Sequence, residues 1–251
     1  MLRLSIVIPV LNEIDNLPVL AKRLSMVNMN CEFIFVDDGS SDGTRELLSE
    51  LSQKDSKFKF VFNECRIGHM GSYLKGLEKA SSTCVVIMDG DLQHPPESLE
   101  GIAKCLENGY DIVVASRYDG RFFIGNRDKT RGIISRGAEF LLKALVKECR
   151  GISDPISGFI GFRKSLIIPI TSNMKGNKLL PFLIMANREA KIGYVHYSFS
   201  ERTAGTSKIV SSRNNFILKY MLEIGEIRRV KRQLVRNMRF DSSHEQVNSK
   251  K

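Results

Sequence analysis

Hydrophobic and polar positions alternate in blocks along the first half of the chain. Five short apolar runs, rich in β-branched residues, are typical of buried strands. They cover residues 4–10, 32–36, 58–62, 85–88 and 111–115. Between them, apolar residues three or four positions apart predict helices that end near residues 26, 53, 80 and 107. Strands that alternate with helices at this spacing predict an α/β fold with a mostly parallel sheet and helices on both faces.

Polar residues follow directly after four of the predicted strands. These residues are Asn12 and Glu13, Asp37 and Asp38, Asp89 and Asp91, and Ser116 and Arg117. In a parallel sheet the carboxyl ends of the strands lie at one edge, and ligands bind there. We therefore expect these side chains to form a single site.

The stretch after the fourth strand carries two aspartates, Asp89 and Asp91, separated by Gly90. Residues two apart in an extended segment point the same way, so both carboxylates can reach one object. Two close carboxylates repel each other unless a cation lies between them. Mg²⁺ suits this position because it binds one or two carboxylates together with substrate phosphates. A surface turn with two solvated aspartates is the alternative, and the rest of the chain has to decide.

Glycine-rich phosphate loops are missing from the sequence. No Gly-x-Gly-x-x-Gly follows the first strand, and no Gly-x-x-x-x-Gly-Lys-Ser/Thr occurs anywhere. A dinucleotide enzyme and a P-loop NTPase are therefore disfavoured. A nucleotide would instead be held by carboxylates and a metal ion.

Charge and cysteine content narrow the function classes further. The formal net charge is +10, and between Arg202 and Arg239 ten Lys and Arg stand against two Glu. This basic segment suits nucleic acid, an anionic membrane surface or a phosphate ligand. Five scattered cysteines without a Cys-x-x-Cys pair argue against a disulfide framework and a zinc site. No apolar run is long enough for a transmembrane helix, and we expect no signal peptide.

Three ordered motifs carry a resemblance to a known family. They are Ile-Val-Ile-Pro-Val-Leu-Asn-Glu, Val-Asp-Asp-Gly-Ser-Ser-Asp-Gly-Thr and Asp-Gly-Asp-Leu-Gln-His-Pro-Pro-Glu. The series resembles the inverting GT-A glycosyltransferases of family 2, in the branch that includes dolichol-phosphate mannose synthase. Ala-Ser-Arg-Tyr at 115–118, Asp-Pro-Ile-Ser-Gly-Phe at 154–159 and Arg-x-x-Gly-x-Ser-Lys at 202–208 strengthen the match. The resemblance covers residues 4–210 and implies the GT-A nucleotide-diphospho-sugar transferase fold, with residues 1–210 as the catalytic domain.

The resemblance implies a sugar nucleotide, GDP-mannose, as the donor. Its binding site would comprise Pro9, Leu11, Glu13, Val36, Asp38, Asp89, Gly90, Lys178, Arg202 and Lys208. Relatives often carry an aromatic residue where this chain has Leu11, which weakens base stacking. Asp91 and Gln93 would hold Mg²⁺ or Mn²⁺, which neutralises the departing diphosphate.

The implied acceptor is a lipid monophosphate such as dolichyl or another polyprenyl phosphate. Arg117, Arg131, Ser135 and Arg202 would bind it, and Asp91 and Arg117 are the expected catalytic residues. Arginine suits phosphate because its planar fork donates two parallel hydrogen bonds. Arg131 and Ser135 are four apart on a helix predicted over 129–148, so they share one face.

A phosphate monoester is largely dianionic near neutral pH, so it attacks the anomeric carbon without first losing a proton. We therefore expect no dedicated general base. Attack opposite the diphosphate inverts the centre and gives dolichyl β-D-mannosyl phosphate and GDP.

Three alternatives remain at this stage. The nearest is the same chemistry with UDP-glucose or another sugar nucleotide, because the motifs define the reaction better than the sugar. A polysaccharide-type transferase with a hydroxyl acceptor would need a carboxylate base, and the stretch 154–158 offers Asp154. A nucleic-acid-binding module would use the basic segment but leaves the ordered acidic residues unexplained, so we expect no nucleic-acid partner.

The C-terminal part predicts a basic amphipathic helix over 211–240 and a disordered polar tail over 241–251. Its apolar stripe and crowded arginines fit a helix that lies on a membrane surface. A helix packed on the domain with a solvated outer face fits equally well. If the helix lies on a membrane, we expect a peripheral protein at the cytoplasmic face of the membrane. It would dock there directly or through a membrane-anchoring partner protein.

Overall fold

The computed structural model describes residues 2–119, 122–123, 129–167, 176, 178–198, 221–230 and 232, with the backbone alone at 122 and 129–134. The helices are α1 (Leu17–Ser25), α2 (Thr44–Lys54), α3 (Gly68–Lys79), α4 (Leu99–Glu107), α5 (Lys129–Leu145) and α6 (Leu180–Ala186). The strands are β1 (Leu4–Val10), β2 (Cys31–Asp37), β3 (Phe58–Phe62), β4 (Cys84–Ile87), β5 (Ile112–Ser116), β6 (Tyr118–Asp119), β7 (Phe122–Phe123), β8 (Ile160–Arg163) and β9 (Ile192–His196). The five strands and the helices predicted from the periodicity are therefore present within a few residues of their expected bounds.

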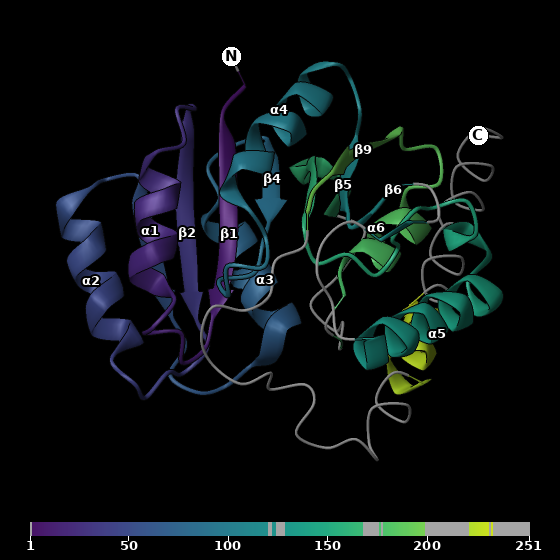
Figure 1. The fold of residues 1–251 in the computed structure, drawn as a ribbon, viewed down its shortest axis with the longest axis horizontal. Coiled ribbons are helices and arrows are strands. Elements are labelled where there is room, and N and C mark those ends of the chain that lie inside the picture. The colour runs from purple at the N-terminus through teal and green to yellow at the C-terminus, as the bar shows by residue number, and fades with distance from the viewer. Residues whose placement is uncertain are drawn as a thin grey trace, which may run out of the picture.

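Seven strands form one sheet in the order β3-β2-β1-β4-β8-β5-β9 (Figure 1). All neighbours pair in parallel except β8, which runs antiparallel to both β4 and β5. Ile160, the first residue of β8, pairs with Ile87 near the end of β4 and with Val114 in β5. The chain therefore enters β8 at the edge where the parallel strands end, and it brings the preceding segment to that edge.

Two hydrophobic clusters lie on opposite faces of the sheet. Ile6 and Ile8 of β1 belong to the cluster that includes apolar residues of α1, α2 and α4. Val7, between them, belongs to the other cluster, with apolar residues of α3, α5 and α6. Side chains alternate faces along a strand, so this division follows from the strand pattern itself. The prediction of helices on both faces is confirmed.

The basic helical segment at 221–230 packs against the domain. Its residues Ile224, Ile227 and Val230 are buried in the same cluster as α3, α5 and α6, and the segment lies beside α5 (Figure 1). Burying one such side chain stabilises the fold by about 1.5–3 kcal/mol. These three residues therefore agree with a helix packed on the domain, because they face the core and not a membrane.

The remaining predictions for the C-terminal region fall outside the described residues. The boundaries at 210 and 240 and the tail at 241–251 belong to this group. None of the helices in the described part of the chain is long and apolar enough to cross a membrane.

Candidate active site

The loop after β4 turns sharply and carries the two aspartates. Asp91 is buried, and its Oδ1 accepts a hydrogen bond from the backbone N–H of Gln93 at 3.2 Å. Leu92 adopts a φ of +65°, in the left-handed region that reverses the chain. A Cβ atom at Gly90 would lie 2.7 Å from Cγ1 of Val10, so glycine lets this loop pack against β1. The carboxylates of Asp89 and Asp91 are thereby held at the end of β4.

His94 fixes this loop from within. Its Nδ1 accepts a hydrogen bond from the backbone N–H of Asp89 at 2.8 Å, and its Nε2 lies 3.8 Å from Asp89 Oδ2. The imidazole stacks on Phe159 with ring centroids 5.0 Å apart. Burial lowers the pKa of His94, although Asp89 and Asp91 act in the opposite direction. A neutral ring with its proton on Nε2 agrees with both the hydrogen bond and the pKa.

Lys178 reaches the same loop from a distant part of the chain. A Cβ atom at Gly158 would lie 3.4 Å from Asp89 Oδ2, 3.5 Å from Lys178 Nζ and 3.5 Å from His94 Cε1. These three side chains therefore surround one position, and a glycine at 158 leaves them room. The structure thus brings Lys178, which we expected to bind the sugar nucleotide, beside the Asp89 carboxylate.

Arg117 forms a buried ion pair with Asp154. Its Nε donates to Asp154 Oδ2 at 2.7 Å and its Nη2 donates to Oδ1 at 2.6 Å. The Asp154 side chain is completely buried, and 12% of the Arg117 side chain is exposed. Burial alone would lower the pKa of Arg117, but the pairing with Asp154 outweighs it and raises the pKa. Both oxygens of Asp154 are thus engaged, which disfavours this residue as a general base for a hydroxyl acceptor.

The predicted nucleotide-binding residues that follow β1 and β2 lie at the same edge of the sheet. Pro9 and Val36 are buried register partners in the sheet, and Leu11 is half-buried. The backbone N–H of Glu13 donates to Thr44 Oγ1 at 3.0 Å.

Asp38 binds the start of α3. Its carboxylate accepts hydrogen bonds from the backbone N–H groups of Ile67 at 2.8 Å and Gly68 at 2.9 Å, and from Asn63 Nδ2 at 3.2 Å. A carboxylate at this position suits the helix dipole. Asp38 therefore has a structural role beside its predicted one in nucleotide binding.

The predicted lipid-phosphate residues are only partly described. Ser135 is buried on α5, and Arg131 lies four residues earlier on the same helix, with its side chain outside the described atoms. Arg202 and Lys208 lie outside the described residues. Arg117 is the one predicted phosphate-binding arginine whose side chain is described.

The acidic residues fit a metal ion that completes its coordination with ligands from a substrate. Among the described residues, no group of three or more His, Cys, Asp or Glu side chains is placed to hold a metal. Asp89 and Asp91 supply hard oxygen ligands, and Gln93, which is half-buried, follows two positions later. Mg²⁺ characteristically binds one or two carboxylates plus substrate phosphates, so this donor set fits a metal–diphosphate complex.

The sequence pattern alone missed two partners at this edge, Asp154 as the ion-pair partner of Arg117 and Glu223 as a contact of the Lys178 segment. Each pair is far apart in the sequence, by 37 and 45 residues. A buried arginine needs a carboxylate partner, and this rule could have pointed to the Asp154 motif.

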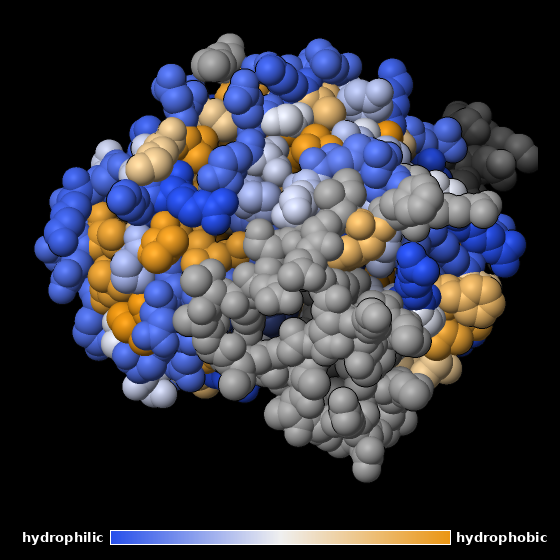
Figure 2. Space-filling view, in the orientation of Figure 1, coloured by the Kyte–Doolittle hydropathy of each residue, from blue (hydrophilic) through white to orange (hydrophobic). Residues whose placement is uncertain are grey.

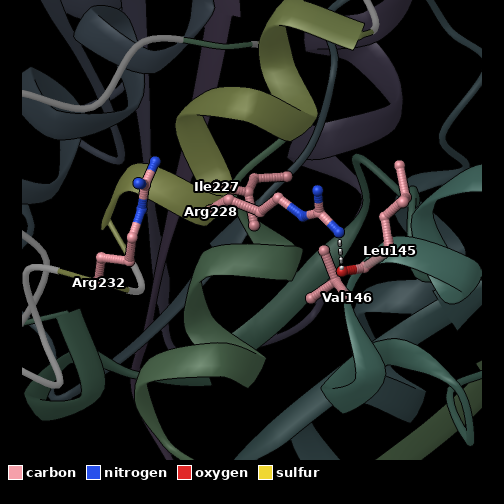
Figure 3. Close-up of a pocket in the computed structure, with 5 residues that line it drawn as sticks. All are labelled: Leu145, Val146, Ile227, Arg228 and Arg232. Atoms are coloured by element: carbon pink, nitrogen blue, oxygen red, sulfur yellow. Dashed lines mark hydrogen bonds between the residues drawn. The ribbon is translucent and has the colours of Figure 1, made fainter.

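A separate pocket of about 450 Å³ lies between α5 and the helical segment at 221–230 (Figure 3). Its lining consists of Leu145, Val146, Ile227, Arg228 and Arg232. Nη2 of Arg228 donates to the carbonyl oxygen of Leu145 at 3.4 Å, the dashed line in Figure 3. None of the predicted site residues lines this pocket, so it is distinct from the strand-end site.

With this geometry established, comparison with known proteins identifies the family. Residues 5–170 match the family described as "Glycosyl transferase family 2". The chain belongs to this family. It is therefore a glycosyltransferase, and the resemblance drawn from its motifs is confirmed.

Two relatives are named dolichol-phosphate mannosyltransferase. The protein of Pyrococcus furiosus is 32% identical over 238 residues, which cover 91% of this chain and 66% of that protein. The protein of Mycosarcoma maydis is 30% identical over 242 residues, which cover 90% of this chain and 79% of that protein. The chain thus spans just under two thirds of the first relative's length.

Solved structures show the same fold. Glucosyl-3-phosphoglycerate synthase from Mycobacterium tuberculosis in complex with UDP superposes with a TM-score of 0.64 at 22% identity, over 89% of this chain and 80% of that chain. The complex of that enzyme with Mn²⁺, UDP-glucose and phosphoglyceric acid gives a TM-score of 0.66 at 20% identity, over 92% of this chain and 80% of that chain. The predicted GT-A fold is confirmed.

Proposed function

We propose that this glycosyltransferase transfers mannose from GDP-mannose to dolichyl or another polyprenyl phosphate, with inversion, to give the β-linked lipid-phosphate mannose and GDP. The main support for this proposal is the ion pair between Arg117 and Asp154. The Asp154 carboxylate is buried and bound by the guanidinium through both oxygens. An acceptor that is already ionised, such as a phosphate monoester, needs no base from this position. The two relatives named dolichol-phosphate mannosyltransferase support the same acceptor class.

In this mechanism the chain's own residues bind and orient both substrates. Asp91 and Gln93 are the proposed ligands of Mg²⁺ or Mn²⁺, which when bound offsets the charge of the departing diphosphate. Lys178 lies beside Asp89, where its ammonium contacts the same diphosphate. Arg117, kept ionised by Asp154, orients the acceptor phosphate toward the anomeric carbon.

The outer surface of α5 supports access to a lipid acceptor. Phe140 is 71% exposed, and Arg136, Lys147 and Arg150 are exposed around it and just beyond the helix. Hydrophobic side chains appear on the surface at the position of α5, whereas hydrophilic ones cover much of the same face (Figure 2). An exposed aromatic side chain among basic ones suits an anionic membrane surface, so we place the protein at the membrane periphery.

A transfer assay tests the proposal. Purified protein is given Mn²⁺ or Mg²⁺, dolichyl phosphate, and radiolabelled GDP-mannose or UDP-glucose in parallel. We expect metal-dependent label in the lipid phase from GDP-mannose. Label from UDP-glucose alone would keep the mechanism and replace the donor, an alternative favoured by the UDP-glucose that the structural relative binds.

Absence of lipid label from both donors, even with a membrane fraction added to supply a partner protein, would overturn the lipid-phosphate acceptor. Label in a saccharide acceptor under those conditions would support the hydroxyl-acceptor alternative.

A further inference from the structure

The helical segment at 221–230 contacts the chain just before α6. Glu223 Oε1 accepts a hydrogen bond from the backbone N–H of Lys178 at 2.9 Å. The ammonium of the same lysine reaches the point beside Gly158 where the Asp89 carboxylate and His94 also lie. We propose that Glu223 is a positioning residue, which holds the Lys178 backbone so that its ammonium stays at the β4 loop.

Gly176 permits the close approach of Glu223. It has a φ of +143°, a conformation that side chains rarely adopt, and a Cβ atom there would lie 3.0 Å from Glu223 Oε1. The glycine conformation and the hydrogen bond two residues later together fit this segment around the carboxylate. The contact therefore depends on the backbone at both positions.

The Glu223 carboxylate lies in the same electrostatic environment as the two aspartates. Tyr73 of α3 is buried, and burial raises the pKa of its hydroxyl. Asp89, Glu223 and Asp91 add to this rise, so all three carboxylates act on one hydroxyl group. Glu223 lies beyond residues 5–170 that match the family, and the geometry that connects it to the β4 loop is its hydrogen bond to Lys178.

The anchoring of its helix makes Glu223 a rigid support. Ile224 and Ile227 are buried in the core cluster on the same helical segment. Glu226, one turn further, instead pairs with Arg229 at 2.8 Å, three residues later on its own helix. Glu226 is therefore a matched control, because it has the same charge and lies on the same helix but does not contact Lys178 in the described structure.

The inference rests on the proposed function in one respect, namely that the Lys178 ammonium contacts the donor diphosphate. Glu223→Ala should lower kcat/KM for the sugar nucleotide about tenfold or more, because it removes a hydrogen bond to a charged acceptor. Glu223→Gln, which retains the acceptor oxygen, should stay within about threefold of the parent, and so should Glu226→Ala. Equal losses in Glu223→Gln and Glu223→Ala would overturn the hydrogen-bond role.

A double-mutant cycle separates positioning from a general structural effect. In a Lys178→Met background the ammonium is gone, so adding Glu223→Ala should cause little further loss of kcat/KM. Fully additive losses would show that Glu223 does not act through Lys178. Hydrogen exchange at the Lys178 amide gives a second measurement, and it should speed up in Glu223→Ala but not in Glu226→Ala.

Calorimetric binding of GDP and UDP with Mn²⁺ keeps the test independent of the acceptor. If no lipid product forms but the parent binds a nucleoside diphosphate, the proposed function fails, and the same variant series read by affinity still decides the role of Glu223. If the parent binds neither diphosphate, or if Glu223→Ala binds as tightly as the parent, the positioning role is overturned.

Discussion

Buried carboxylates lie at both ends of the parallel strands of the central sheet, but their partners differ. We call the side where these strands begin the amino edge and the side where they end the carboxyl edge. At the amino edge, Glu32 accepts hydrogen bonds from Ser5 Oγ at 2.5 Å, from the backbone N–H and hydroxyl of Ser81, and from Lys59 Nζ at 2.5 Å. Burial alone would raise the pKa of Glu32, but the hydrogen bonds from Lys59, Ser5 and Ser81 lower it from 4.5 to about 2. This charge is satisfied by the protein itself and serves stability.

At the carboxyl edge, the charged groups are the ones for which we propose a ligand. Asp89 and Asp91, separated by Gly90, follow the end of β4, and the Lys178 ammonium and the Arg117 guanidinium come from distant segments. Two carboxylates this close together repel each other unless a cation lies between them. Mg²⁺ from solution suits this role, because it binds one or two carboxylates together with substrate phosphates. Burial of a carboxylate therefore does not by itself indicate a ligand site. What distinguishes Glu32 is that its hydrogen-bond partners come from the protein itself.

The largest effect should come from removing the charge of Asp91, the proposed metal ligand at the carboxyl edge. Asp91→Asn keeps the size of the side chain but removes its charge, and we expect kcat to fall about a thousandfold or more. Turnover with saturating Mn²⁺ measures this loss, and the thermal midpoint should move little. A midpoint drop as large as that of a core variant would place Asp91 with the structural carboxylates instead.

Breaking the buried pair at the same edge should affect stability and activity together. Asp154→Asn leaves the Arg117 guanidinium buried without its charged partner, which we expect to cost about 3–5 kcal/mol of unfolding free energy. Urea denaturation measures this cost, and the transfer assay should show reduced kcat in the protein that remains folded. An unchanged unfolding free energy would contradict the buried pair.

Glu32 at the amino edge should alter stability without altering turnover. Its folded-state pKa lies below its ordinary value, so its contribution is complete above about pH 4.5 and is lost as the pH falls toward 2. We expect Glu32→Gln to lose about 2 kcal/mol of unfolding free energy at pH 7 and to show a smaller loss on acidification than the parent.

Denaturant titrations across that pH window measure the difference. Glu50→Gln, which changes an exposed carboxylate paired with Lys54 at 3.9 Å, is the control and should change stability by less than about 0.5 kcal/mol. A fall in kcat for Glu32→Gln would contradict the separation of the two edges.

The smallest effect should come from the loop contact of His94. His94→Asn can keep an acceptor near the Asp89 backbone N–H, whereas His94→Ala cannot. We expect His94→Ala to lower kcat about tenfold and His94→Asn to recover part of that loss. Both variants remove the stacking on Phe159, so a lower thermal midpoint common to both, with equal kcat, would limit His94 to packing.

Much of the fold could be predicted from local patterns. The apolar run of β1 predicts a strand that is buried on both faces, and the spacing of Leu17, Leu20 and Leu24 predicts a helix with one buried face; both elements are correct. The position of Asp89 and Asp91 at the strand-end edge followed from the same reasoning. These features depend on neighbours that are close in the sequence.

Other features depend on contacts across long stretches of chain. The reversed direction of β8 requires its pairing with both β4 and β5, and no local pattern encodes it. The apolar stripe at 221–230 is the same whether it faces a membrane or the core, so periodicity could not choose between them. Only the three-dimensional structure shows Ile224 and Ile227 buried on the domain.

The insertion of β8 between β4 and β5 also constrains how the site can be assembled. Residues of β8 pair with residues 73–79 positions earlier in β4 and 46–50 positions earlier in β5, so this part of the sheet forms only when long stretches of chain are brought together. The segment just before β8 supplies Asp154, the buried partner of Arg117, and the pairing of β8 with β4 and β5 holds the end of that segment at the sheet. A fragment that ends before β8 would therefore contain both aspartates and the arginine yet lack the closed edge, and the enzyme cannot be divided there into two halves that each keep a working site.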